Sequence, residues 1–353
     1  MHILVLSSQA SNTGSTLRAE YIFKYLKKIN RETEYIRPPF KSMPFMLDFG
    51  LSLIYNFFKL MNRRFDYVII VKPYPNTVLP AMLLKSRGAK IAIDIDDLDH
   101  GYRGGFLSGV IKKMQDKLIK KADLLTTHNS ELMKLIKKEH PEYAGRTYML
   151  NQCVDREIFS PRAVNKDEVK RIRGLYKGRK ILFYMAHLNI ASYLEEILVS
   201  LKHVDTNALL LVAGGGPLAF LYEAMARRMK LGDRVVFLGQ LELKNAANYV
   251  AASDVCLVYY KDMPVNNYRA SMKLREYLAM GKSVAASAVG EIRQFKGCVF
   301  LSGPGSKVYA ATVNRAIKSI EKRGEKGYKL IIKKFDWKSE IRQFHKILLG
   351  GLK

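Results

Sequence analysis

The sequence predicts the α/β fold class, with two doubly wound parallel-sheet domains of Rossmann-like type. Short apolar runs of strand character alternate with stretches of helical periodicity, as in parallel sheets covered by helices on both faces. The 353 residues are too many for one ordinary domain and fit two domains of roughly 150 to 200 residues. A polar, basic stretch at 160–168 is the best candidate for the linker.

The strands are expected where apolar, β-branched and aromatic residues gather in short runs. In doubly wound sheets, ligands bind beyond the carboxyl ends of the strands, so we expect binding residues in the loops that follow them. The expected strands are His2–Ser7, Tyr67–Val71, Lys90–Ile95, Leu124–Thr126, Ile181–Met185, Leu209–Ala213, Val235–Leu238, Val255–Tyr259 and Ser283–Ala286.

The loop after the first expected strand is small, polar and centred on Gly14. Such a loop lets backbone N–H groups approach a phosphate or a sugar. Arg18 lies just inside the helix that follows and could add a positive charge. An ordinary turn between a strand and a helix has the same composition, so both interpretations stay open.

Two segments of the first half have a composition that suits either a core or a membrane surface. Segment 45–61 is apolar nearly all round and predicts a buried helix or a membrane-facing one. Segment 106–121 carries an apolar stripe with lysines beside it, the pattern of a helix that lies on anionic lipid. The alternative for this second segment is a core helix with a solvated basic face. The stripe is formed by Phe106, Val110, Met114 and Leu118.

Several titratable side chains end or follow the expected strand 90–95, and four of them are candidates for a site. They are Asp94, Asp96, Asp97 and His100. A metal-binding carboxylate cluster is one interpretation, but alternate residues of a strand point to opposite faces, so only part of the group can share a site. Lys72, which ends the preceding strand, is a further candidate for a ligand contact.

A glycine-rich turn, Gly214-Gly215-Gly216-Pro217, follows the strand 209–213. With Ala219 it satisfies G-x-G-x-x-A, which raises a dinucleotide-binding interpretation. That interpretation expects an acidic residue at the end of the next strand, but Asp233 precedes this strand and Gly239 follows it. The sequence therefore does not support a dinucleotide site.

The segment from Ser271 to Gly281 predicts one helix with a cap at each end and an anion at its start. Ser271 can cap the first turn, and Gly281 can end the helix. Lys273 falls in the first turn, where a cation opposes the helix dipole, so its presence suggests a bound anion. Glu276 lies on the same face, placed for ribose hydroxyls. A nucleoside diphosphate would satisfy all three; an amphipathic helix with two solvated charges is the alternative.

The overall charge favours an anionic partner. The chain has 59 Lys+Arg against 32 Asp+Glu, a net charge of +27, which draws a protein toward polyanions or anionic membranes. Residues 1–150 carry 24 basic and 14 acidic side chains, and residues 301–353 carry 13 and 4.

The cysteines and the amino terminus favour the cytoplasm. The three cysteines are odd in number and lack metal-ligand spacing, which indicates a reducing compartment and inert, buried thiols. The amino terminus has the pattern of a strand rather than of a signal peptide, and no stretch has the length and apolarity of a spanning helix. We therefore expect a cytoplasmic location.

Taken together, the motifs resemble the retaining nucleotide-sugar glycosyltransferases of family four, which have the GT-B fold. The resemblance is specific over 209–291 and looser elsewhere. It implies an acceptor-side domain at 1–158, a donor-binding domain at 159–335, and a last helix, 336–353, that packs back on the first domain. It rests on the turn 214–217 and the segments Asp233–Gly239, Ala252–Val255, Lys273–Val284 and Gly290-Glu291, with looser support from the Gly14 loop, Asp94–Asp97 and Asn151–Pro161.

The resemblance assigns roles to individual residues. Members bind a nucleoside-diphosphate sugar and transfer the sugar with retention, without a metal or another cofactor. Glu276 matches the ribose-binding glutamate, and the residues expected near the rest of the donor are Gly214, Gly216, Gln240, Leu241 and Lys273. Arg18 and the Gly14 loop could help Lys273 to stabilise the leaving diphosphate. Asp97 and His100 are expected to face the acceptor, which gives Asp97, His100 and Lys273 as catalytic candidates.

Two positions depart from the family pattern. Many relatives carry a glutamate eight positions before the ribose-binding one, and here that position is Tyr268. Many also carry an Arg and a Lys after the first strand of the second domain, where this chain offers only His187. The donor pocket must therefore differ in detail from theirs.

The predicted function is transfer of a sugar from a nucleotide donor to a lipid-linked or cell-surface glycan acceptor, at the cytoplasmic face of a membrane. An epimerase-like GT-B enzyme is one alternative, although its expected acid and histidine pattern is not evident. A nucleic-acid-binding protein is the other, suggested only by the net charge of +27. The aromatic residues lie mostly in apolar helices and strands instead of on a basic face, so no nucleic-acid partner is expected.

Overall fold

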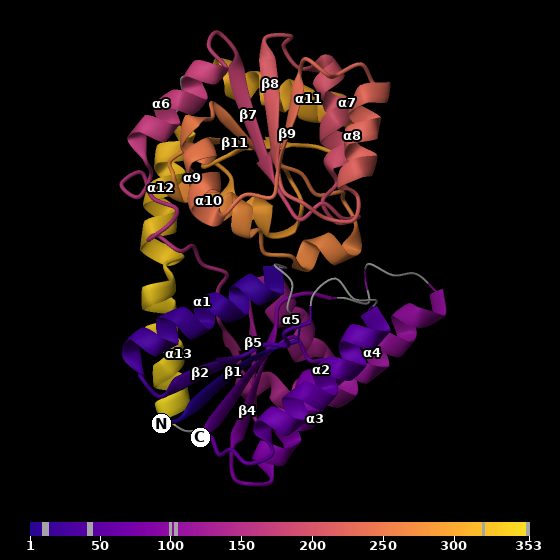
Figure 1. Ribbon diagram of the computed structural model, residues 1–353, viewed down its shortest axis with the longest axis vertical. Coiled ribbons are helices and arrows are strands. Elements are labelled where there is room, and N and C mark those ends of the chain that lie inside the picture. Colours follow the sequence, from indigo (N-terminus) through magenta and orange to yellow (C-terminus); the bar gives the residue numbers. More distant parts are fainter. Residues whose placement is uncertain (9–13, 41–44, 99–100, 102–104, 320–321, 351–353) are drawn as a thin grey trace. The chain divides into compact units, whose positions relative to one another are not determined.

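The computed structural model describes residues 1–8, 14–40, 45–98, 101, 105–319 and 322–350, and it divides the chain into two compact units (Figure 1). Unit 1 contains Met1–Gln152, Tyr268–Ala270 and Trp337–Lys353; unit 2 contains Cys153–Asn267 and Ser271–Asp336. The division falls slightly before the expected boundary at 158/159, because Val154 and Phe159 are buried in the core of unit 2. The expected linker, 160–168, therefore lies within unit 2.

Unit 1 is built on a six-stranded parallel sheet, counted over the described residues, with the order β2-β1-β3-β4-β5-β6. The order reverses at β1, which marks the switch point where doubly wound sheets bind ligands. Its strands are β1 (Ile3–Ser7), β2 (Thr33–Ile36), β3 (Tyr67–Val71), β4 (Lys90–Ile95), β5 (Leu124–Thr127) and β6 (Thr147–Met149). Its helices are α1 (Gly14–Ile29), α2 (Phe45–Leu60), α3 (Pro75–Lys85), α4 (Gly105–Ile119), α5 (Ser130–Glu139), η2 (Pro141–Arg146) and α13 (Trp337–Leu349).

Unit 2 repeats this architecture, with a described parallel sheet of order β12-β11-β10-β7-β8-β9. Its strands are β7 (Lys180–Met185), β8 (Ala208–Ala213), β9 (Val235–Gly239), β10 (Val255–Val258), β11 (Ser283–Ser287) and β12 (Phe300–Ser302). The helical elements along this part of the chain are α6 (Lys166–Leu175), α7 (Leu194–Ser200), η3 (Leu201–His203), α8 (Ala219–Arg228), α9 (Leu243–Ala252), η4 (Pro264–Tyr268), α10 (Met272–Ala279), η5 (Gly290–Phe295), α11 (Ser306–Lys318) and α12 (Arg323–Lys334).

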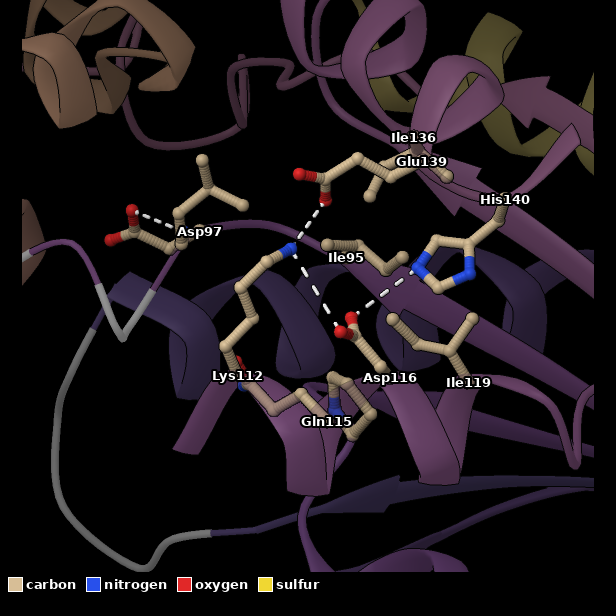
Figure 2. Close-up of a pocket in the computed structure, with 11 residues that line it drawn as sticks. Ile95, Asp97, Lys112, Gln115, Asp116, Ile119, Ile136, Glu139 and His140 are labelled. Atoms are coloured by element: carbon tan, nitrogen blue, oxygen red, sulfur yellow. Dashed lines mark hydrogen bonds and ion pairs between the residues drawn. The ribbon is translucent and has the colours of Figure 1, made fainter. Parts of the chain in front are cut away.

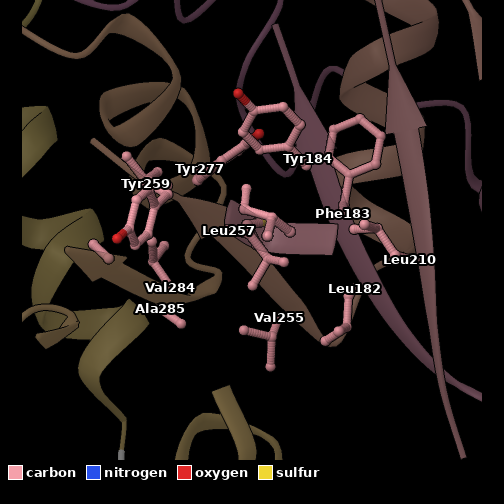
Figure 3. Close-up of a cluster of buried hydrophobic side chains, with 14 of the residues drawn as sticks. Leu182, Phe183, Tyr184, Leu210, Val255, Leu257, Tyr259, Tyr277, Val284 and Ala285 are labelled. Carbon is pink, nitrogen blue, oxygen red and sulfur yellow. The ribbon is translucent and has the colours of Figure 1, made fainter. Parts of the chain in front are cut away.

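The core of unit 2 packs the central strands against α10. Figure 3 shows Phe183 of β7, Leu210 of β8 and Leu257 of β10 together with Tyr277 of α10. All four side chains are buried. Strands covered on both faces read as continuous apolar runs, which is why these were visible in the sequence.

The carboxyl-terminal helix α13 belongs to unit 1, where it packs beside α1 (Figure 1). The Tyr67 hydroxyl donates a hydrogen bond to the Leu348 carbonyl at 2.8 Å, and the Trp337 side chain is fully buried. The chain thus returns to its first unit after completing the second, as the family resemblance implies.

The structure also describes the helix lengths, the cysteines and the apolar stripe of α4. Over the described ranges, the helices lack the length and apolarity needed to cross a bilayer. Cys153 and Cys256 are buried free thiols, while Cys298 is partly exposed. The helix α4 turns Leu118 inward and leaves Val110 45% exposed, so its expected apolar stripe is only partly buried.

Candidate functional site

The helix α10 has both predicted caps. The Ser271 Oγ accepts a hydrogen bond from the Leu274 N–H at 3.2 Å, which satisfies one donor of the first turn. At the other end Gly281 has a positive φ of 69°, and its N–H bonds to the Leu278 carbonyl at 2.9 Å. The Lys282 N–H reaches the Tyr277 carbonyl at 3.1 Å, which completes a Schellman motif. Local sequence chemistry therefore fixes where α10 begins and ends.

Lys273 is held over an aromatic ring at the start of α10. Its Nζ lies 4.5 Å from the centroid of the Tyr184 ring and donates to the Tyr184 hydroxyl at 3.4 Å. Tyr184 is fully buried on β7, and its own hydroxyl donates to the Ser192 carbonyl. A cation over an aromatic face is attracted by the ring quadrupole, so this contact orients the ammonium group. Sequence analysis did not single out Tyr184, because a tyrosine in an apolar strand reads as core.

Glu276 lies one turn further along and is 6% exposed. Burial raises the pKa of its carboxyl group to about 8; Asp155 raises this pKa further, and Lys273 opposes the shift. With the other described residues the carboxyl group makes no hydrogen bond. A buried carboxylate without donors is costly, so ligand hydroxyl groups that donate to it would be bound favourably.

The glycine-rich turn after β8 packs backbone to backbone against the loop after β7. Gly214 has φ 142° and Gly216 has φ 150°. A Cβ atom on Gly214 would lie 1.8 Å from the Ala186 carbonyl oxygen, and one on Gly216 would lie 2.5 Å from that of Leu188. The Leu188 N–H also bonds to the Gly215 carbonyl at 2.9 Å. Only glycine permits this approach, so both residues shape the edge of the sheet.

The other donor-side candidates lie at the same edge of unit 2. Gln240 and Leu241 directly follow β9, and a Cβ atom on Gly215 would lie 3.6 Å from the Gln240 Cβ. His187 is exposed on the loop after β7. Loops after three neighbouring strands therefore meet here, at the carboxyl end of a parallel sheet where ligands bind.

A buried ion pair supports α10 from within. The Arg275 guanidinium donates to the Glu291 carboxylate of η5 and, at 3.1 Å, to the Ser271 carbonyl. Its Cζ lies 4.7 Å from the centroid of the Phe335 ring. Both charged side chains are buried, so the pair anchors the first turn of α10 to the loop after β11. The oppositely charged residues within apolar surroundings were the signal available in the sequence.

Arg18 is engaged inside unit 1. Its Nε and Nη2 donate to the two Asp94 carboxylate oxygens at 2.6 and 2.9 Å, and Nη2 also donates to the Leu150 carbonyl at 2.6 Å. The guanidinium is 1% exposed. The structure thus gives Arg18 a structural role that differs from the expected diphosphate contact, because a bidentate buried pair is costly to break.

The other unit 1 candidates are only partly described. Gly14 begins α1, while residues 9–13 of its loop and His100 lie outside the described residues. Asp97 is partly exposed, and its Oδ1 accepts a hydrogen bond from the Leu98 N–H at 2.9 Å.

Asp96 and Lys72 interact electrostatically at the carboxyl edge of the unit 1 sheet. Burial raises the pKa of Asp96 to about 6, and the Lys72 charge opposes this shift. Lys72 has a positive φ of 69°, a strained conformation for a non-glycine residue that is common at functional sites. The sequence suggested Lys72 as a candidate but gave Asp96 no separate role.

The comparisons with known proteins agree with the family resemblance. The profile of the family described as "Glycosyl transferases group 1" matches residues 165–323. The provisionally named glycosyltransferase EpsF of Bacillus subtilis strain 168 is 32% identical over 100 residues, which are 28% of this chain and 26% of EpsF. The chain therefore spans about a quarter (26%) of the length of this relative.

Solved structures share the fold over nearly the whole chain. Sucrose-phosphate synthase from Thermosynechococcus elongatus gives a TM-score of 0.81 at 16% identity, covering 99% of each chain. HepE from Anabaena, in complex with UDP-glucose, gives 0.78 at 13% identity, covering 99% of this chain and 100% of HepE. A glycosyltransferase from Rickettsia africae gives 0.72 at 15% identity, covering 100% of this chain and 99% of that one. The predicted GT-B fold is confirmed.

Proposed function

We propose that the chain is a retaining glycosyltransferase, because residues 165–323 match the profile of the group 1 glycosyl transferases. Its donor would be a nucleoside-diphosphate sugar bound at the carboxyl edge of the unit 2 sheet. Its acceptor would be a lipid-linked or cell-surface glycan of polysaccharide biosynthesis.

The observation that carries this proposal is the buried Glu276 carboxyl group, which lacks hydrogen bonds to described residues one turn from Lys273. Two ribose hydroxyl groups would donate to its oxygens and offset its burial. The Lys273 ammonium and the N–H groups at the start of α10 would face the diphosphate, whose charge they complement. The same groups would stabilise the diphosphate as it leaves, which is where negative charge develops in the transition state.

Titration with UDP and GDP by isothermal calorimetry tests the donor site. UDP is the first choice, because the HepE structure contains UDP-glucose. We expect binding of one nucleoside diphosphate to the wild type, and a loss of at least about tenfold for Glu276→Ala, since the variant lacks the ribose acceptor. Glu242→Gln, on an exposed residue of the same unit, is the matched control. Absence of binding to both nucleotides would refute the proposal.

Turnover tests the activity itself. A screen of nucleotide sugars, read by nucleotide released with and without a glycan acceptor, would identify the donor. Asp97 and His100 remain proposed acceptor-side catalytic residues, so Asp97→Asn and His100→Ala should lower kcat while nucleotide affinity stays unchanged. A product formed from the donor alone would instead favour the epimerase-like alternative.

We further propose that unit 1 contacts an anionic membrane through α2. This helix has an inverted pattern, in which Ser52 and Asn56 are buried while three apolar side chains of the opposite face are exposed. The Asn56 Nδ2 donates to the Asn76 carbonyl of α3 at 2.7 Å, which holds the polar face inward. The exposed set is Ile54 (54%), Phe57 (46%) and Phe58 (66%), at the i, i+3, i+4 spacing of one helix face, with Met61 (38%) directly after the helix.

Charge supports an anionic lipid as the partner of this face. Lys59 on α2 and Arg64 just beyond it are exposed beside the apolar residues. An apolar stripe flanked by basic side chains is the pattern of a helix lying in a membrane interface. A glycosyltransferase with a lipid-linked acceptor would find its substrate at that surface, which places the protein at the cytoplasmic face in this proposal.

Flotation with vesicles tests the membrane contact. The wild type should bind vesicles that contain phosphatidylglycerol, and less so at high salt. The double variant Phe57→Ser/Phe58→Ser should lose at least about tenfold in partition, because two apolar side chains no longer insert. Phe220→Ser on α8, where the phenylalanine is 76% exposed, is the matched control. Equal binding by the double variant and the wild type would contradict the proposal.

A further inference from the structure

A small cavity of about 20 Å³ is lined entirely by residues of unit 1 (Figure 2). Its walls combine apolar side chains, including Ile95, Ile119 and Ile136, with a cluster of titratable groups from α4 and from the end of α5. Apolar walls lower the local dielectric and strengthen charge interactions inside. The family profile does not cover this part of the chain.

His140 is the first of these groups. It caps the end of α5, where its backbone N–H donates to the Ile136 carbonyl at 2.8 Å, and its side chain is buried, with the residue 4% exposed. Its Nε2 is buried and makes no hydrogen bond with the described residues. The Asp116 Oδ1 lies 3.4 Å from this nitrogen without the alignment of a hydrogen bond. A buried ring nitrogen of this kind is available as a metal ligand.

Two carboxylates face the same point. One oxygen of Asp116, one oxygen of Glu139 and one His140 nitrogen all lie within 4.8 Å of one another. Two donors bound to one tetrahedral zinc ion at about 2.0–2.1 Å lie about 3.4 Å apart, which is the observed separation of Asp116 Oδ1 and His140 Nε2. The partly exposed Glu139 side chain can close the remaining distance.

The second ring nitrogen of His140 also has a suitable partner. Its Nδ1 lies 3.8 Å from the Glu142 Oε1. In protein metal sites, a ligating histidine commonly directs its other nitrogen to a carboxylate, which fixes the tautomer and the ring orientation. Glu142 is placed to do this from η2.

The cluster already holds a cation, the ammonium group of Lys112. Its Nζ lies 2.8 Å from the Glu139 Oε2 and 3.8 Å from the Asp116 Oδ2 (Figure 2). The Lys112 side chain is 36% exposed, so it can turn outward to solvent. The position between the two carboxylates thus suits positive charge and can be vacated.

We propose that Asp116, Glu139 and His140 form a binding site for a divalent transition metal, with zinc as the best match to one nitrogen and two carboxylate ligands. A water molecule completes the tetrahedron, and Lys112 leaves as the metal enters. The ion would join the last turn of α4 to the end of α5 and stabilise unit 1. Asp97 also lines this cavity, whereas the proposed donor-side residues belong to unit 2, so zinc binding and nucleotide binding are tested independently of each other.

Zinc titration of the full chain, with any affinity tag removed and after treatment with a chelator, tests the site. The wild type should bind one zinc ion that raises Tm, and Co²⁺ in its place should give the visible absorption of a tetrahedral centre. Asp116→Asn and His140→Ala should each lower zinc affinity at least tenfold. Lys112→Met should raise the affinity, because it removes the competing cation. Glu131→Gln, an exposed carboxylate on α5 paired with Lys134, is the matched control and should bind as the wild type does.

The zinc affinities of these variants distinguish a specific metal site from a network of salt bridges. Equal zinc affinity for the wild type and Asp116→Asn would show an adventitious ion only and overturn the proposal. Weaker binding by Lys112→Met would also overturn it, because the lysine would then support the cluster instead of competing with the metal. If His140→Ala fails to fold, Asp116→Asn and Glu139→Gln decide the question.

Discussion

Each unit has one basic side chain that the sequence suggested as a diphosphate contact. Arg18 of unit 1 and Lys273 of unit 2 both lie in the first turns of a helix after a strand or loop that could meet a diphosphate. In the structure, the carboxylate beside Arg18 has all its partners, while Glu276 beside Lys273 has no hydrogen bond to a described residue. A satisfied buried pair stabilises a fold, and an unsatisfied buried carboxyl group marks a place for a ligand.

The largest effect should come from breaking the satisfied pair. Arg18→Ala leaves the Asp94 carboxylate buried, with Thr126 as a donor at 2.6 Å but without a counter-charge. We expect a loss of about 3–5 kcal/mol in the free energy of unfolding. Urea denaturation of the full chain measures it. A loss below about 1 kcal/mol would mean that Arg18 can leave Asp94 at little cost, and it would restore the diphosphate role.

Substitution in the glycine-rich turn after β8, beside the proposed donor site, should have the next largest destabilising effect. In Gly214→Ala the new Cβ would meet the Ala186 carbonyl oxygen at 1.8 Å, and φ would stay near 142° only under strain. We expect about 3 kcal/mol of destabilisation together with weaker nucleotide binding. Gly178→Ala is the control, because Gly178 has φ 81° but nothing within 4 Å of its Cβ position. Similar losses for both variants would assign the effect to φ alone.

Glu276 should make stability depend on pH. Its pKa rises from 4.5 in the unfolded chain to about 8 in the folded one, so the folded state binds the proton more tightly. The stability it contributes is complete below pH 4.5 and is lost as the pH rises through about 8. Glu276→Gln should remove this loss, roughly 4 kcal/mol, as measured by denaturation at pH 5 and pH 9. An identical pH dependence of stability in the variant would contradict the buried, unpartnered state.

Lys273 should contribute to binding far more than to folding. Lys273→Ala should weaken nucleoside-diphosphate affinity by about 1–2 kcal/mol, roughly tenfold, because one charge facing the diphosphate is lost. Stability should change by less than about 0.5 kcal/mol, since the side chain is partly exposed. Calorimetric titration and urea denaturation measure the two quantities. A variant that loses stability but keeps its affinity would reverse the contrast with Arg18.

The strands show how far sequence patterns reach. All nine expected strands are present, including the apolar edge strand β9, but the expectation missed β2, β6 and β12, the other three edge strands of the described sheets. Central strands are buried on both faces and read as continuous apolar runs. An edge strand is short and partly polar, and its sequence resembles a loop. Tertiary pairing with a neighbour is what makes it a strand.

The sequence of a helix likewise does not always show which of its faces is buried. The segment that forms α2 is apolar nearly all round, so its sequence could not tell which side is buried. The structure buries Ser52 and Asn56 and exposes Phe57 and Phe58, because Asn56 is bonded to α3. The α10 caps, by contrast, were predicted correctly, since they depend on residues within one turn of each helix end.

The sequence by itself determined nine of the described strands and their alternation with helices, the caps of α10, the glycines of the turn after β8 and the family resemblance. Each depends on local spacing or on residue types that only one backbone conformation accepts. Tertiary structure alone decided that Arg18 pairs with Asp94, that Glu276 is buried without donors, and that His140 meets Asp116. These properties depend on which distant segments surround a side chain, and burial and charge contacts then set its chemistry.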